Sequence, residues 1–152
     1  MKREDFDDRA LKTIIHDTVA QSMLLFAIHL SEQMTLMLSE KGTGKVYRIG
    51  KGKKTHRASA KGHPPAVRTG LLRRSYSLSE EGSPDAQGIC VFENTPTMLK
   101  FTYGTNVEYA AELEDTSKLD RPHLRPILNI VKDDLATIIH DQIKSTLTTI
   151  NK

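Results

Sequence analysis

The positive charge of this chain is concentrated in residues 41–74, which we call the cationic segment. The segment holds eleven of the 22 Lys and Arg residues and none of the 19 Asp and Glu residues. The rest of the chain has eleven basic and 19 acidic residues and so carries −8, although the whole chain carries +3. A stretch this cationic cannot enter a hydrophobic core, so it must face solvent, nucleic acid or an acidic protein surface.

Most of this segment, residues 41–69, shows no hydrophobic period and is rich in Gly and Pro. A loop this long in a compact domain is usually functional or disordered. Residues 46–49 could instead form one strand of a basic hairpin. Composition leaves a solvated, mobile loop, a nucleic-acid contact and a protein contact open, and only Tyr47 is available for stacking on bases. We expect residues 41–68 to extend away from the body and to make mostly intermolecular contacts.

Two long helices are predicted, one near each end of the chain. The first covers residues 8–40, with a stop near Gly42, and the second begins near Pro126. In both stretches apolar residues recur at steps of three or four. The stripes are Leu11, Ile15, Val19, Met23, Phe26, Leu30, Met34 and Met37 in the first helix, and Leu128, Val131, Leu135, Ile138, Ile139, Ile143, Leu147 and Ile150 in the second.

The middle of the first helix is apolar nearly all round, because Leu24, Leu25 and Ile28 add to its stripe. Two interpretations follow. The helix is either the central element of the core, or it contacts a neighbouring subunit on its second face.

Short elements are predicted between the long helices. Alternating residues indicate strands over residues 75–79 and 99–103, and an apolar run indicates a buried strand over residues 88–93. A loop at residues 80–85 and a turn at residues 94–97 join these strands. Thr69 and Thr105 are candidate caps of short helical turns, the second running to about Leu113.

The predicted fold class is α+β, in one domain over residues 1–152. A small antiparallel sheet, consisting of a meander and a possible basic hairpin at about residues 41–69, packs against the long N-terminal and C-terminal helices. The lone Cys90 excludes an intrachain disulfide and is expected to be a buried core thiol in preference to a reactive one. The charged N-terminus and the short apolar run at residues 23–30 predict synthesis in the cytoplasm and no membrane partner.

No pattern of catalytic residues is present in the sequence. The glycines of the cationic segment lack the spacing of a phosphate-binding loop, and no two histidines are spaced i, i+4 to hold a metal on one helix face. His29 reads as a satisfied core or interface residue. An acidic group could in principle do acid–base chemistry, but nothing pairs it with a nucleophile, so we favour a solvated or interface role. Its members are Glu108, Glu112, Glu114 and Asp115.

Three segments carry more information than composition does. Residues 64–75 read Pro-Pro-Ala-Val-Arg-Thr-Gly-Leu-Leu-Arg-Arg-Ser, residues 104–110 read Gly-Thr-Asn-Val-Glu-Tyr-Ala, and residues 121–126 read Arg-Pro-His-Leu-Arg-Pro. In this order and spacing, over roughly residues 5–145, they resemble the head–tail connector and tail-completion family of siphophages. The chain departs from that family at residues 114–117, where an aromatic-Gly-Thr turn is common after the glutamate.

The resemblance implies a structural virion protein that forms a ring, commonly a hexamer, in the phage neck between the head and the tail. Its expected partners are copies of itself, a neighbouring connector or stopper protein, the tail-tube protein and the genomic DNA that passes through the lumen. Such a protein is assembled in the host cytoplasm and resides in the virion. It is not an enzyme, and no catalytic residue, cofactor or metal is expected. The alternative is a basic nucleic-acid-binding protein that uses residues 41–74.

The expected interface combines apolar, basic and acidic side chains, because head-to-tail ring contacts join two different surfaces of each subunit. The basic segment would meet the acidic group of the next copy, and Arg121 and Arg125 are free to grip carboxylates. The predicted interface residues are Leu24, Leu25, Ile28, Lys51, Lys53, Lys54, Arg57, Arg68, Arg73, Arg74, Glu108, Glu112, Glu114, Asp115, Arg121 and Arg125.

Overall fold

The computed structural model describes residues 8–78 and 87–150, and it confirms the α+β class. Along the described chain, a long helix comes first and another comes last, and two short helices and two antiparallel hairpins lie between them in sequence. The elements in chain order are α1 (Asp8–Met37), β1 (Val46–Arg48), β2 (Thr55–Arg57), α2 (Leu71–Ser75), β3 (Gly88–Thr95), β4 (Met98–Thr105), α3 (Ala110–Glu114) and α4 (Leu124–Ile150).

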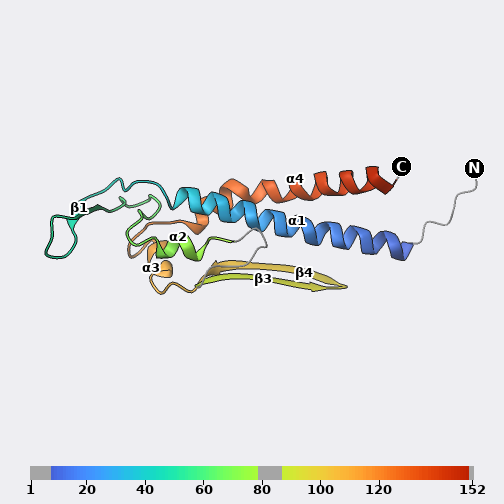
Figure 1. The fold of residues 1–152 in the computed structure, drawn as a ribbon, viewed down its shortest axis with the longest axis horizontal. Coiled ribbons are helices and arrows are strands. Elements are labelled where there is room, and N and C mark those ends of the chain that lie inside the picture. Colours follow the sequence, from blue (N-terminus) through green and yellow to red (C-terminus); the bar gives the residue numbers. More distant parts are fainter. Residues whose placement is uncertain (1–7, 79–86, 151–152) are drawn as a thin grey trace, which may run out of the picture.

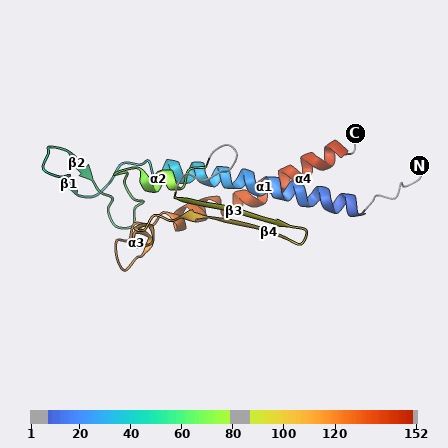
Figure 2. The ribbon, with the colours of Figure 1, turned by 60° about the horizontal axis from the view of Figure 1, so that its bottom comes forward.

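The two long helices run side by side in opposite directions (Figure 1). The β3–β4 hairpin lies along another side of α1, and the β1–β2 hairpin extends beyond the far end of the helix pair (Figures 1 and 2). The start of α1 and the end of α4 therefore lie together at the end opposite the β1–β2 hairpin. The molecule is a rod with a cationic hairpin at one end.

The core fills the space between the second half of α1 and the first half of α4. Its largest contributors from the two helices are Phe26, Leu30, Met34, Ile127 and Val131. The predicted stripe of α1 is correct over residues 26–34, whereas Ile15, nearer its start, is exposed. The second half of α1 thus anchors the fold.

The predicted stripe of α4 is wrong at its start. Ile127 is buried, whereas the adjacent Leu128 is 50% exposed, and Leu147 near the end is also exposed. Both Ile127 and Leu128 fit a step of three or four to Val131, so periodicity cannot choose between them. Contacts at the beginning of α4, described below, determine which face of the helix is turned toward the core.

The predicted strand at residues 75–79 is wrong over its described part. Ser75 ends α2 and Tyr76 is a fully buried turn residue, while residue 79, like the predicted loop at residues 80–85, lies outside the described residues. The Tyr76 carbonyl accepts hydrogen bonds from Ser31 Oγ (2.9 Å) and from the Tyr103 hydroxyl (2.5 Å), and Leu78 N–H donates to Ser31 Oγ (2.9 Å). The backbone is therefore tied to α1 and to a side chain of β4, and only Leu78 of the predicted strand forms a β-bridge.

The β3–β4 hairpin confirms the predicted turn and the alternation of β4, but β3 is not a buried strand. Val91 and Phe92 are 46% and 38% exposed, and Phe92 stacks on its cross-strand partner Phe101 with ring centroids 4.9 Å apart. Cys90 is only partly buried, and this burial raises the pKa of its thiol. Within the described residues each strand pairs only with the other, so both outer edges are open.

Within the described residues one helix, Arg9–Met37, is long and apolar enough to cross a membrane by length and composition alone, with a mean hydropathy of 1.2. A helix in the core of its own domain passes the same test. This helix buries Ser22 and Ser31, and His29 Nε2 lies 2.9 Å from Asp134 Oδ2 of α4. We therefore interpret α1 as a core helix that packs on α4. The expectation that His29 is a satisfied residue is confirmed.

Candidate functional site

The cationic segment begins with a hairpin whose strands pair Tyr47 with His56 at their centre. Strand pairing continues below the hairpin, where Gly44 N–H donates to the Ala58 carbonyl (2.7 Å) and Ala58 N–H donates to the Lys45 carbonyl (2.9 Å). A side chain at Gly42 would collide with the Arg57 carbonyl, since a Cβ there would lie 2.0 Å from that oxygen. The predicted basic hairpin therefore exists and is ordered mainly by its own backbone.

The hairpin tip carries Lys51, Lys53 and Lys54, all exposed. The expectation that residues 41–68 extend away from the body holds for the hairpin (Figure 1) but is wrong for the residues after it. Ala58 and Ser59 are buried, and the Ser59 hydroxyl donates to the Pro64 carbonyl (2.5 Å). The chain after the hairpin thus folds back onto the body.

None of the eleven Lys and Arg side chains in residues 41–74 pairs with a carboxylate within the described parts of the chain. Arg73 Nη1 donates to Ser39 Oγ (3.2 Å), and Arg74 Nη1 donates to the Thr69 carbonyl (3.3 Å). Both partners are neutral. The positive charge at this end of the rod is therefore available to an outside anion.

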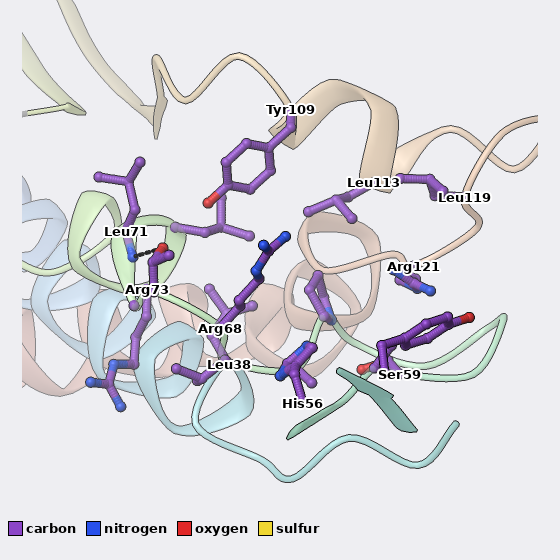
Figure 3. A pocket seen from close by; sticks show the side chains of 18 of the residues that line it. Leu38, His56, Ser59, Arg68, Leu71, Arg73, Tyr109, Leu113, Leu119 and Arg121 are labelled. Carbon is purple, nitrogen blue, oxygen red and sulfur yellow. Dashed lines mark hydrogen bonds between the residues drawn. The ribbon is translucent and has the colours of Figure 1, made fainter. Parts of the chain in front are cut away.

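A pocket of about 600 Å³ lies where the hairpin meets α2, α3 and the loop after α3. Its walls carry Arg48, Arg68, Arg73, Arg121 and His56, and none of the described acidic residues lines it. Figure 3 shows Arg68 reaching toward Tyr109, while Arg121 lies on the wall near Leu119. Much of the remaining wall is apolar and includes Leu38, Ile49, Val67, Leu71, Leu72, Leu113 and Leu119.

Arg121 occupies an unusual position in this wall. Its backbone N–H donates to the Leu113 carbonyl (2.7 Å), which fixes the loop against α3. The preceding residue, Asp120, has a φ of 47°, a left-handed conformation that Asp tolerates better than most residues. The Arg121 Nε atom is buried and makes no hydrogen bond within the described residues. A buried donor without an acceptor is costly, and the side chain that carries it belongs to the wall of the pocket.

The acidic group predicted from the sequence does not converge on one point. Glu112 faces solvent and lies 3.6 Å from Lys118 Nζ, and Glu108 is exposed. Asp115 accepts hydrogen bonds from Ser117 N–H (2.8 Å) and Oγ (2.7 Å), which hold its pKa below the usual value. The group therefore offers no paired carboxylates for acid–base chemistry.

Glu114 has an internal role that the sequence did not indicate. Its Oε2 accepts hydrogen bonds from the backbone N–H groups of His123 (2.8 Å) and Leu124 (3.1 Å). Its Oε1 accepts from the Arg125 backbone N–H (3.1 Å) and from Arg125 Nε (3.1 Å). One carboxylate thus caps the first turn of α4, where backbone donors have no partner within the helix. Glu114 and Arg125 form an ion pair within the subunit. Their predicted contact with a neighbouring subunit stays a prediction.

The electrostatics of this cap follow from burial and hydrogen bonding. Burial raises the pKa of Glu114, but the hydrogen bonds from residues 123–125 outweigh burial and place the pKa below its usual value. His123 is 0% exposed, and its Nδ1 lies 3.1 Å from Glu114 Oε2. Burial lowers the pKa of His123, and the neighbouring carboxylate opposes that shift only in part.

The segments that resemble the connector family meet around Tyr76. Its hydroxyl lies 3.2 Å from His123 Nε2, and burial, with a smaller contribution from Glu114, raises its pKa. Thr105 Oγ1 donates to Ser75 Oγ (2.7 Å), which joins the second segment to the first. Sequence reasoning missed Tyr76 and His123 as buried partners, and nothing in their local pattern distinguishes them from surface residues.

The predicted caps of the short helices differ from the observed ones. Gly70, with φ of 76°, precedes α2, and Tyr109 precedes α3, in both cases without a side-chain cap. Thr69 and Thr105 instead accept hydrogen bonds from N–H groups two residues later, at Leu71 (3.3 Å) and Val107 (3.2 Å). These are local turns before each helix.

The apolar surface of α1 is partly uncovered, as the expected subunit contact requires. Leu25 is 44% exposed, and Leu24 and Ile28 are partly exposed. Ile130 on α4 is exposed as well. These side chains are accessible to a partner, and their use by one stays a prediction.

Within residues 8–78 and 87–150 no group of three or more His, Cys, Asp or Glu side chains is placed to hold a metal ion. No protein-family model, curated protein or solved structure matches the chain.

Proposed function

We propose that this chain is a structural subunit of a ring in the neck of a long-tailed bacteriophage, where it joins the DNA-filled head to the tail. The observation that carries the proposal is the meeting of the three connector-like segments around Tyr76. Thr105 of the second segment bonds to Ser75 of the first, and His123 of the third bonds to Tyr76, the residue that follows Ser75. Motif residues that bond to one another inside the subunit support a structural role, in which the motifs stabilise the fold.

The distribution of charge supports an assembly role. The cationic segment has no carboxylate partner among the described residues, while the rest of the chain carries −8 by sequence. Surfaces of opposite sign on one subunit favour head-to-tail contacts between copies, because such contacts join different surfaces. The uncovered apolar residues of α1 would add hydrophobic area to such a contact.

The proposal is tested by the oligomeric state of the purified chain. Wild type should form closed rings in negative-stain micrographs and a discrete oligomer in light scattering at low ionic strength. Leu25→Glu should prevent assembly while the monomer stays folded, because Leu25 is half-exposed in the subunit. Thr13→Glu, an exposed change on α1 that adds the same charge, is the matched control. A monomeric wild type at all salt and protein concentrations would contradict the proposal.

Nucleic-acid binding is a second candidate, favoured by the hairpin tip. Lys51, Lys53 and Lys54 are exposed in the turn between β1 and β2, and they have no carboxylate partner in the described chain. The hairpin itself extends from the end of the rod (Figure 1). Binding through phosphates would weaken steeply with salt, with a slope that reports the number of contacts. Replacing all three lysines with alanine should reduce that slope by about two to three if the tip is the contact. A slope unchanged by the replacement would exclude this use of the hairpin.

A further inference from the structure

We infer that the pocket at the root of the cationic hairpin receives an acidic segment, residues 4–7, of a second copy of this chain. The inference deepens the proposed ring function and rests on it. It names the occupant of the pocket and the order in which copies contact each other.

The charges that line the pocket favour the binding of an anion. Arg48, Arg68 and Arg121 line it, none has an ion-pair partner within the described residues, and no acidic residue lines the wall. The buried Nε of Arg121 makes no hydrogen bond within that part of the chain. Guanidinium groups bind carboxylates through two parallel hydrogen bonds, so three arginines suit a short run of carboxylates.

The apolar part of the wall favours a ligand that also carries an apolar group. Val67, Tyr109 and Leu119 contribute exposed apolar surface to its wall. A duplex nucleic acid offers phosphates on a convex surface and no aliphatic or aromatic side chain, so it would leave these walls in contact with water. A peptide that alternates carboxylates with a hydrophobic residue matches both kinds of wall. This combination favours a protein segment as the occupant.

The chain contains such a segment. Residues 4–7 read Glu-Asp-Phe-Asp, three carboxylates around one aromatic ring. The three carboxylates could pair with Arg48, Arg68 and Arg121, three of the four arginines that line the pocket, and Phe6 supplies an apolar side chain for the wall. Residues 4–7 therefore match the pocket both in charge and in hydrophobic character.

The segment cannot reach the pocket of its own subunit. α1 has 30 residues and is therefore about 45 Å long. The start of α1 lies at one end of the rod and the hairpin at the other (Figure 1). Seven residues preceding the helix span at most about 25 Å when extended. A contact between residues 4–7 and the pocket must therefore join two copies, and as a heterologous contact it repeats from copy to copy.

The direct test measures the binding of a fluorescein-labelled peptide of residues 1–9 to the full-length chain by anisotropy. We expect saturable binding that Arg68→Glu weakens at least about tenfold, since Arg68 is exposed and its replacement should not disturb folding. Lys53→Glu at the hairpin tip is the matched control, because it makes the same charge change away from the pocket. A peptide with Phe6→Ser should bind more weakly than the native sequence.

Several outcomes would overturn the inference. These are no binding of the peptide, equal loss of binding in Arg68→Glu and Lys53→Glu, and indifference to Phe6→Ser. Displacement of the peptide by duplex DNA with no effect of Phe6→Ser would assign the pocket to nucleic acid instead. Circular dichroism verifies that each variant remains folded.

Assembly separates this inference from the proposed function. Removal of residues 2–7 should prevent ring formation, and Glu4→Arg/Asp5→Arg should do the same. Mixing Glu4→Arg/Asp5→Arg with Arg68→Glu/Arg121→Glu should restore contacts through the reversed pair. If the shortened chain forms rings as wild type does, the inference fails and the ring function stands. If the peptide binds at Arg68 but wild type never assembles, the pocket assignment stands and the ring function fails.

Discussion

The cap of α4 and the cationic segment show opposite uses of charge in the same chain. At the cap, one carboxylate of Glu114 accepts four hydrogen bonds from residues 123–125 within a largely buried environment. In the cationic segment, eleven cations have no carboxylate partner among the described residues. The first arrangement stabilises the subunit, and the second leaves charge for a partner. Acidic residues close in sequence need not share a role either, since Glu112 faces solvent while Glu114 caps α4.

The largest expected effect is the loss of the cap. Glu114→Ala should lower the free energy of unfolding by about 2–3 kcal/mol, because several donors at the start of α4 lose a charged acceptor. Glu112→Ala, two residues earlier and exposed, should cost less than about 0.5 kcal/mol. Urea denaturation followed by circular dichroism measures both. Equal costs for the two variants would remove the distinction between the cap and its acidic neighbours.

The stability of the subunit should depend on pH through the buried groups at the cap of α4. The pKa of His123 and that of Glu114 both lie below their ordinary values of 6.5 and 4.5. The unfolded chain therefore binds more protons than the folded one below those values, so stability falls on acidification. The loss begins below about pH 6.5 for His123 and below about pH 4.5 for Glu114. The melting temperatures of wild type and His123→Asn should converge as the pH falls below about 6.5, because only wild type loses the contribution of His123.

A smaller effect is expected from the hydroxyl of Tyr76. Tyr76→Phe removes the group that lies 3.2 Å from His123 Nε2 in a fully buried site. The expected cost is about 1 kcal/mol, because a buried ring nitrogen loses its partner. Tyr109→Phe changes the same group on an exposed residue and should have no measurable effect on urea denaturation. A neutral Tyr76→Phe would mean that the hydroxyl and the imidazole do not stabilise each other.

The smallest effect on folding is expected at the hairpin tip. Replacing Lys51, Lys53 and Lys54 with glutamate should change the free energy of unfolding by less than about 0.5 kcal/mol. Head–tail joining, assayed with the other neck components, should nevertheless stop, because the partner would meet reversed charge. A large loss of stability would show that these lysines contribute to the fold, and the contrast with the cap would disappear.

The sequence predicts the parts of this fold that depend on local periodicity. The extent of α1, the basic hairpin and the turn between β3 and β4 follow from steps of three or four, from glycines and from alternation. The rotation of α4 does not, because Ile127 and Leu128 both continue a helical stripe. The strand predicted at residues 75–79 fails because alternation also describes a turn whose backbone is bound by α1 and β4.

Some features of the candidate site can likewise be predicted from the sequence, and others cannot. Exposure of the lysines at the hairpin tip could be predicted from charge density alone. The role of Glu114 could not, because its partners lie nine to eleven residues away and are backbone groups that no residue type reveals. The pocket also depends on long-range placement, since Arg121 meets Arg68 only after α3 and its loop have folded back.

The open edges of the β3–β4 hairpin have a consequence for the isolated subunit. Each strand has eight residues and, among the described residues, pairs with no strand on its outer side, beside the exposed Val91 and Phe92. Such edges are templates for aggregation, and charged residues along them act as gatekeepers. The Glu93–Lys100 pair, 2.7 Å between Oε1 and Nζ, is the charged pair placed to do so in the described hairpin. A subunit held at high concentration should therefore associate edge to edge, and Lys100→Val should hasten that aggregation.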